Sequence, residues 1–247
     1  MSALGIALDL ALRRRGAAFD PVQLFPGGTL GALYDPAPGQ VWQDAAGTLP
    51  AAVGDPVGLL ADRSGNGNHA VQASAAARPV LRQDSNGRHY LECDGIDDFL
   101  RAGFALPQPW ERICALRQVG WGANRHVLGG VTVNAGVLQQ FGASAALRLF
   151  SGTGSATTNS EPVLGANEVI AELHSGAASS LTVNAGAPVI ADYGSAATAG
   201  VTIGASSSGA SFSSIRLYAL AMRDGPLTAS ARASLRAWMA ARAAISM

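Results

Sequence analysis

The sequence predicts an all-β fold, a two-sheet antiparallel sandwich with an N-terminal arm and one C-terminal helix. From about residue 57 to residue 225, short apolar stretches alternate with turns rich in Gly, Ser, Asn and Ala. Many short strands with regular turns are typical of sandwiches and barrels. Between residues 21 and 56, Gly and Pro are too frequent for long helices. A chain of 247 residues is long enough for one large β domain.

The first segment, residues 1–20, is predicted to be an arm outside the sandwich. Large apolar residues occupy every second position from Leu4 to Leu12, with small or polar residues between them. This period of two favours a strand with one buried face over the helix that leucine and alanine would also allow. Residues 13–20 break the pattern. Because the arm's apolar face needs a cover, we expect it to dock on another chain, either a different protein or equivalent arms of an oligomer.

The sandwich itself is predicted over residues 21–225. Its apolar stretches predict strands at residues 88–93, 99–101, 113–118, 126–133, 147–150, 169–173, 181–183, 201–203 and 214–222. The string Thr-Val-Asn-Ala-Gly occurs twice, at residues 132–136 and 182–186. Since Asn and Gly tolerate a positive φ, both copies predict tight hairpins.

The last segment, residues 226–247, is predicted to be a helix packed on the sandwich. Thr228 can cap its first turn. Leu235, Trp238 and Met239 fall on one face at helical spacing. Arg232, Arg236 and Arg242 lie at other positions and can stay in water.

Composition excludes several classes of partner. The 17 basic residues, all of them arginine, balance 17 acidic ones, so no net field draws the chain to nucleic acid. No apolar run is long enough for membrane insertion. The apolar start has no positive region before it, so we expect folding in a bacterial cytoplasm rather than secretion. Cys93 and Cys114 are predicted to be buried free thiols.

Several motifs, in this order, resemble one known family. They lie at residues 34–48 and 62–70, at 78–79 and 90–100, and at 181–184, 201–205 and 212–220, followed by Trp238 in the terminal helix. Together they resemble the concanavalin A-like, laminin G-type jelly-roll modules common in bacteriophage and prophage structural proteins. The resemblance covers nearly the whole chain from Leu24 onward and implies a concanavalin A-like jelly roll.

The resemblance also implies a function. We expect a non-enzymatic bacteriophage virion protein, a tail, fibre or head-decoration component, whose arm binds other virion proteins. Its lectin-like sandwich would bind a host surface glycan or a neighbouring virion protein, and the protein would form a homo-oligomer. A purely structural decoration or cement protein is the alternative, and a glycan hydrolase is the distant one.

Candidate ligand sites are few. Oxygen-bearing residues in the turns could hold calcium, namely Asp62, Asn66, Asn68, Asp94, Asp97 and Asp98, of which Asp62, Asn66, Asn68 and Asp97 are the candidates retained. The same residue types also form turns without any metal, and we favour that interpretation. No other cofactor is expected. Trp110 and Trp121 flank a Gly-rich turn and could stack on a sugar ring, although core packing is the commoner use of tryptophan.

A hydrolytic site is not expected. Retaining hydrolysis needs two carboxyl groups about 5 Å apart. Glu168 and Glu172, the nearest candidates, are four residues apart, which on a strand is about 13 Å. The motif of the related glucanases is also missing, so no catalytic residues are expected.

Overall fold

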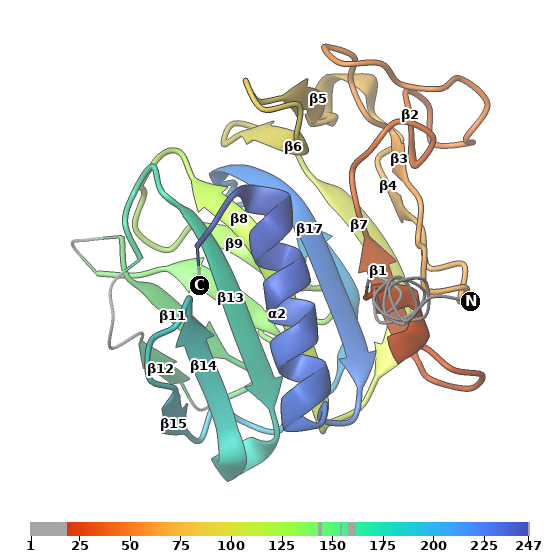
Figure 1. The fold of residues 1–247 in the computed structure, drawn as a ribbon. Helices are drawn as coiled ribbons and strands as arrows, with labels where there is room; N and C mark the ends of the chain where they lie inside the picture. The colour runs from red at the N-terminus through yellow and green to blue at the C-terminus, as the bar shows by residue number, and fades with distance from the viewer. Residues whose placement is uncertain (1–18, 143–144, 154, 158–161, 247) are drawn as a thin grey trace, which may run out of the picture.

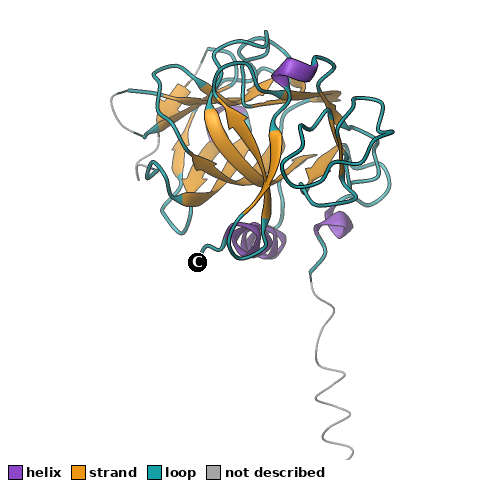
Figure 2. Ribbon diagram, turned by 90° about the horizontal axis from the view of Figure 1, so that it is seen from above, coloured by secondary structure: helices purple, strands orange, loops and turns teal. Residues whose placement is uncertain are grey.

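The computed structural model describes residues 19–142, 145–153, 155–157 and 162–246. The predicted arm lies almost entirely outside these residues. Two antiparallel sheets stack face to face, and one helix lies against the outside of one of them (Figures 1 and 2). The predicted two-sheet sandwich with a C-terminal helix is therefore confirmed.

The eight-stranded sheet lies next to the helix. Its order is β15-β14-β13-β8-β17-β6-β5. The long strand β17 pairs with β6 through its first half and with β1 through its second half. The strands are β1 (Gly31–Tyr34), β5 (Val80–Gln83), β6 (His89–Asp94), β8 (Trp110–Gln118), β13 (Asn167–His174), β14 (Ser179–Val183), β15 (Val189–Ala191) and β17 (Ser214–Asp224).

The nine-stranded sheet forms the other layer, in the order β12-β11-β10-β9-β16-β7-β4-β3-β2. Its strands are β2 (Val41–Trp42), β3 (Leu59–Leu60), β4 (Ala70–Val71), β7 (Leu100–Leu106), β9 (His126–Gly130), β10 (Val137–Gln140), β11 (Leu147–Phe150), β12 (Ser155–Thr157) and β16 (Thr198–Ile203). Three short 3-10 helices, at Pro21–Leu24, Ala75–Ala77 and Gly176–Ala178, complete the described elements.

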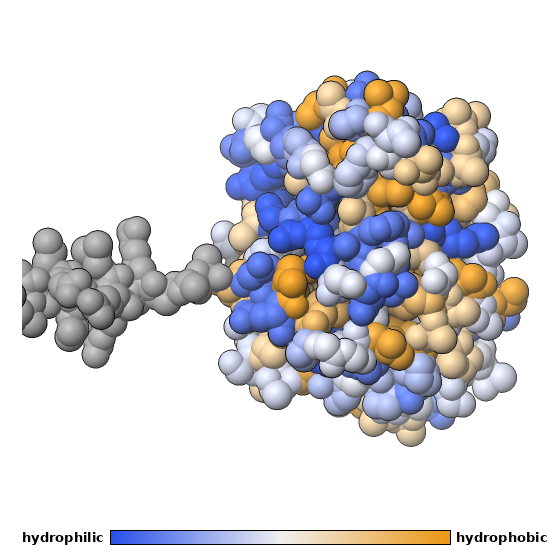
Figure 3. Space-filling model, turned by 90° about the vertical axis from the view of Figure 1, so that its right-hand side faces the viewer, coloured by the Kyte–Doolittle hydropathy of each residue, from blue (hydrophilic) through white to orange (hydrophobic). Residues whose placement is uncertain are grey.

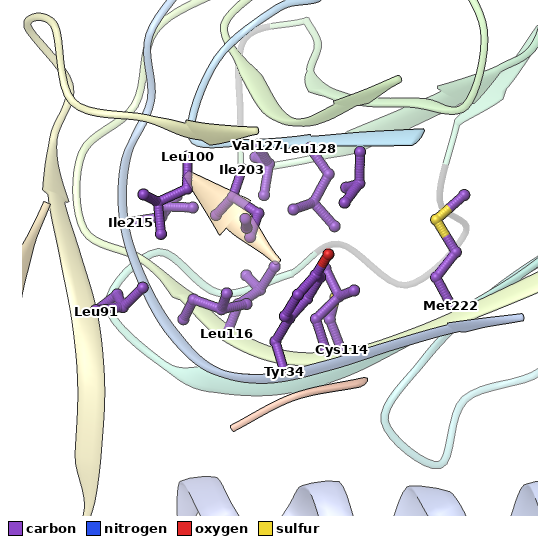
Figure 4. Close-up of a cluster of buried hydrophobic side chains, with 14 of the residues drawn as sticks. Tyr34, Leu91, Leu100, Cys114, Leu116, Val127, Leu128, Ile203, Ile215 and Met222 are labelled. Carbon is purple, nitrogen blue, oxygen red and sulfur yellow. The ribbon is translucent and has the colours of Figure 1, made fainter. Parts of the chain in front are cut away.

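The main core lies between the two sheets. Alternate residues of each strand point into it, as a period of two requires. Figure 4 shows side chains from both sheets meeting there, among them Tyr34, Leu116, Leu128 and Ile203. Cys114 belongs to the same cluster, and it and Cys93 are buried and unpaired, as predicted.

A second apolar layer holds the helix α2 (Ala229–Ala243) on the eight-stranded sheet. Thr228 caps the helix by accepting a hydrogen bond from the Ala231 amide at 3.2 Å, as the sequence predicts. Leu235 and Met239 are buried against β8, β13 and β17. Burial of each such side chain contributes roughly 1.5–3 kcal/mol, so α2 is a firm cover for this sheet.

The two Thr-Val-Asn-Ala-Gly strings form turns between neighbouring strands, β9 with β10 and β14 with β15. Asn134 and Asn184 both have positive φ, at 57° and 47°. Asparagine tolerates this left-handed conformation, as the sequence prediction of tight hairpins requires. None of the described helices has the length and apolar character needed to cross a membrane.

Candidate functional site

The outer face of the nine-stranded sheet is the broad surface that no described α-helix covers (Figure 2). Strand register assigns its residues. Val41, Leu60 and Ala70 point into the core, so their neighbours on the opposite face point outward. One outward row runs across the strands from Trp42 through Leu59, Val71 and Arg101 to Thr202 and Gly129.

This sheet carries no acidic residue in any of its described strands. The eight-stranded sheet differs, since its described strands carry Asp94, Asp224 and the four glutamates Glu92, Glu111, Glu168 and Glu172. The free outer face therefore offers cationic, aromatic and amide groups without carboxylates on its strands.

Arg148 lies at the centre of a cluster of side chains on this face. Leu147 and Leu149 point into the core, which turns Arg148 on β11 outward. Its guanidinium lies 4.1 Å from the ring centre of Phe141 and 5.1 Å from that of Phe150. Gln139 Oε1 accepts hydrogen bonds from Arg148 Nε at 3.2 Å and Nη2 at 2.6 Å. These contacts fix the guanidinium plane.

A hollow of about 280 Å³ lies beside Arg148. The remaining lining residues are Asn134, Phe150, Gly152, Thr153 and Ser155. Amide and hydroxyl groups that surround one aromatic ring and one guanidinium are suited to a polyhydroxylated ligand, because sugars have apolar ring faces and many hydroxyls. We call this the Arg148 hollow.

His126 borders the same region, because it pairs with Gln139 across β9 and β10. Burial lowers the pKa of His126, and the nearby Arg148 charge lowers it further. The imidazole is therefore neutral at pH 7 and adds a hydrogen-bonding group without adding charge.

The far end of the outer face carries a second aromatic side chain. Trp42, which is half-buried, lines a shallow groove of about 230 Å³ together with Leu59, Ala61 and His69. Neither Trp42 nor Arg148 is among the binding residues predicted from the sequence. The signal for Arg148 was present in the alternation of Leu147, Arg148, Leu149 and Phe150, which places the arginine and the phenylalanine on one face.

The two tryptophans that the sequence suggested for sugar stacking have different surroundings. Trp110 is fully buried and stacks on His174 with ring centres 3.6 Å apart, so its faces are closed to a ligand. Trp121 is half-exposed in the loop after β8. The structure does not bring the two tryptophans into one platform, since Trp110 lies in the core.

A charged cluster surrounds Trp110 inside the sandwich. Arg112 and Glu172 are fully buried and form a bidentate pair, with Nη2 2.6 Å from Oε2 and Nε 3.0 Å from Oε1. His174 Nε2 lies 3.3 Å from the same carboxylate. Arg112, despite the cost of burial, keeps the pKa of Glu172 below its usual value, whereas burial lowers the pKa of His174 to about 4. The cluster is a buried ion pair with a neutral histidine, in which Arg112 Nη1 and His174 Nδ1 have no hydrogen-bond partner among the described residues.

Glu168, at the other end of β13, has no cation beside it among the described residues. Burial raises its pKa to about 7, although its Oε1 accepts a hydrogen bond from the Val163 amide at 2.7 Å. Glu168 lies opposite Leu116, whereas Glu172 lies opposite Arg112. The two glutamates share a strand but belong to separate environments, one protonated near neutral pH and one ionised.

The residues proposed for calcium are held by the protein itself. Asp62 accepts hydrogen bonds from the amides of Leu33, Ser64 and Asn68 and from the Ser64 hydroxyl. Asn66 and Asn68 donate their amides to the Gly31 carbonyl. This is the turn-fixing arrangement that the sequence analysis favoured for these three residues.

Asp97 lies elsewhere, in the turn before β7. One carboxylate oxygen of Asp97, one of Asp94 and one of Asp98 lie within 4.8 Å of one another. Burial and the two neighbouring carboxylates together raise the pKa of Asp98 to about 6. Three carboxylates at this separation could accept a cation such as calcium. The structure thus separates Asp97 from Asp62, Asn66 and Asn68, which the sequence analysis had grouped with it.

The comparisons with known proteins show which solved structures share the fold of this chain. No protein-family model matches the chain, and no curated protein matches it. Among solved structures, a GH54 α-L-arabinofuranosidase with a cyclic sulfate inhibitor has a TM-score of 0.66 at 14% identity, over 91% of this chain and 66% of that one. A Trypanosoma rangeli sialidase in complex with the inhibitor DANA has a TM-score of 0.53 at 13% identity, over 92% of this chain and 36% of that one.

An arabinofuranosidase complexed with arabinofuranosyl-alpha-1,2-xylobiose is also similar, with a TM-score of 0.64 at 14% identity, over 91% of this chain and 65% of the other. This chain thus spans about a third of the sialidase and just under two thirds of the arabinofuranosidases. At these identities the likeness shows the sandwich fold.

These comparisons contradict the expectation of a non-enzymatic bacteriophage virion protein. The similar structures are glycosidases, crystallised with inhibitors or with an oligosaccharide, and they provide no phage context. The expected function and the expected lack of enzymatic activity are both wrong on this comparison. The glycan hydrolase, which the sequence analysis placed last, agrees with it best. The physical cause of the error is that a sandwich built from short strands and turns is shared by many functions.

Proposed function

We propose that this chain is a carbohydrate-active sandwich of the kind found in glycoside hydrolases, and that it holds its glycan on the outer face of the nine-stranded sheet. The supporting observation is the Arg148 hollow, where Phe150 and Arg148 stand among the amide and hydroxyl groups of Asn134, Thr153 and Ser155. We also propose that the sandwich is of the concanavalin A-like type.

The two ends of this face favour an extended ligand. Trp42 lies on β2, at one edge of the sheet, and Phe150 lies on β11, close to the other edge. Both occupy the outer face, and aromatic rings stack on sugar rings without regard to the exact sugar. A glycan chain that crosses the strands would contact both rings.

A binding experiment tests the proposal. Phe150→Ala removes the ring beside the hollow and should weaken binding of an arabinoxylan oligosaccharide or a sialylated oligosaccharide at least tenfold in calorimetry. Trp238→Ala is the matched control, because Trp238 is also half-buried and also has an arginine guanidinium against its ring, but lies on α2 beside the other sheet. If the parent chain binds none of a panel of neutral and acidic oligosaccharides, or if the two variants bind equally, the proposed site is wrong.

Hydrolysis of a glycosidic bond is the second proposed activity. Glu168 is the candidate general acid, because burial raises its pKa to about 7. It lies buried on the eight-stranded sheet, so cleavage by Glu168 would take place away from the Arg148 hollow. Release of new reducing ends from oligosaccharides should be measured for the parent chain and for Glu168→Gln. Loss of release in this variant, with glycan binding retained, would support the role. Release that Glu168→Gln leaves unchanged would exclude it.

A further inference from the structure

The charge of the Arg148 hollow bears on which sugars it selects. Arg148 makes no ion pair with any residue that the structure describes. Its hydrogen bonds go to Gln139, an uncharged side chain. Arg101, on the same outer face, donates to Thr202 Oγ1 at 3.3 Å and to the Ser207 carbonyl at 2.6 Å, which are also uncharged.

Other arginines of the chain show the usual alternative. Arg112 pairs with Glu172, Arg216 with Glu92, and Arg232 with Glu111. The sequence thus places carboxylates beside arginines on the eight-stranded sheet but none on the described strands of the nine-stranded sheet. Arg148 therefore keeps an uncompensated positive charge on this face, and that charge also contributes to lowering the pKa of His126.

Arg148 is prepared for an anionic partner. Burial lowers the pKa of its guanidinium, which means that the cation has lost part of its hydration without gaining a counter-charge. Phe141, Phe150 and Gln139 hold the group in place. A planar carboxylate would restore the lost stabilisation through charge-assisted hydrogen bonds at little further cost in side-chain entropy.

We infer that the Arg148 hollow recognises a sugar that carries a carboxylate, with Arg148 bound to the carboxylate, Phe150 against the sugar ring and the groups of Asn134, Thr153 and Ser155 near its hydroxyls. This inference rests on the proposed function and makes it more specific. The ligand class is an acidic glycan, either a uronic acid or another sugar acid in the chain.

A matched pair of ligands tests the inference. The probe is a xylo-oligosaccharide that bears one glucuronic acid, compared with the same oligosaccharide after its carboxyl group has been reduced to the alcohol. We expect the parent chain to bind the acidic form at least tenfold more tightly, as one charge-assisted hydrogen bond implies. The preference should shrink as salt is added, because the interaction is a partly exposed charge pair.

Variants test whether Arg148 causes the preference for the acidic oligosaccharide. Arg148→Gln should bind the acidic and reduced forms equally, whereas Arg117→Gln should keep the preference, because Arg117 lies on β8 and faces the α2 side of the other sheet. Phe150→Ala should weaken both forms. Equal binding of both forms by the parent chain, or a preference that survives Arg148→Gln, overturns the inference and leaves the proposed function standing. Failure of both forms to bind overturns the inference and counts against the proposed function as well.

Discussion

Arginines on the two sheets differ in their surroundings, since those on one sheet are paired with carboxylates and those on the other are not. On the eight-stranded sheet, Arg112 is buried against Glu172, and Arg232 of the covering helix is paired with Glu111. On the nine-stranded sheet, Arg101 and Arg148 donate hydrogen bonds only to uncharged oxygens among the described residues. The first arrangement uses charge to fix the fold, and the second leaves charge for a ligand. Variants on the two sheets should therefore differ in kind, with stability affected on one and binding on the other.

The largest effect on stability is expected at the buried pair. Glu172→Gln keeps the size of the side chain but leaves Arg112 as an uncompensated cation in the core. Breaking a buried pair in this way costs roughly 3–5 kcal/mol. Chemical denaturation should show this loss in the free energy of unfolding. A loss below about 1 kcal/mol would mean that water reaches the pair, contrary to its complete burial.

Lowering the pH should destabilise the same cluster, because His174 becomes protonated. Its pKa is lowered to about 4 in the folded chain, against about 6.5 when unfolded. The unfolded chain therefore binds the extra proton between pH 6.5 and 4, so this contribution is complete above pH 6.5 and is lost as the pH falls. The expected loss is roughly 3 kcal/mol.

His174→Gln checks the acid response, because it should flatten the pH dependence of unfolding in this window. Glu168 has the opposite effect on the pH dependence of stability. Its pKa is raised to about 7 in the folded chain, so its contribution to the free energy of unfolding grows as the pH falls. The comparison with the parent chain therefore has to be made at each pH. An unchanged slope in His174→Gln would contradict the assignment.

A smaller loss is expected where the helix joins its sheet. Glu111 accepts hydrogen bonds from Arg232 Nε at 2.5 Å and from the Leu227 amide at 2.8 Å. Glu111→Gln weakens both at a buried position, at a cost of about 2 kcal/mol. Glu92→Gln is the control, because its pairs with Arg82 and Arg216 are more exposed and exposed pairs contribute less than about 1 kcal/mol. Equal losses would remove the distinction between the two positions.

The smallest effect on stability is expected on the free face. Arg148→Gln removes a partly exposed cation that has no described ion pair, together with its hydrogen bonds to Gln139 and its contacts with two rings, so the free energy of unfolding should fall by only about 1 kcal/mol. Thermal unfolding of the variant and the parent chain measures this difference. A loss of 2 kcal/mol or more would show that Arg148 is a structural residue, like Arg112.

The fold was predictable because it depends on patterns of period two and on turns. The stretches at 126–133 and 147–150 became β9 and β11, and Asn134 and Asn184 took the positive φ expected of them. Short strands such as β2, β3 and β4 escaped prediction, because two residues carry no period. Their pairing comes from the neighbouring strands.

The candidate site was less predictable because it depends on which outward residues meet. Arg148 and Phe141 are far enough apart in sequence that only the β10–β11 hairpin joins them. Trp110 belonged to the core because its strand places it inward, against His174, which composition cannot show. The inward arginine at position 112 likewise gave no sign of its partner sixty residues away.

The most direct test of the central claim is to map where a glycan binds. Backbone amide resonances of the labelled chain should be recorded by NMR while an acidic xylo-oligosaccharide is added. We predict the largest shifts at Asn134, Gln139, Arg148, Phe150 and Ser155, with little change along β13, β14 and α2. Shifts confined to the eight-stranded sheet and its helix would contradict the assignment of the nine-stranded sheet as the glycan-binding face.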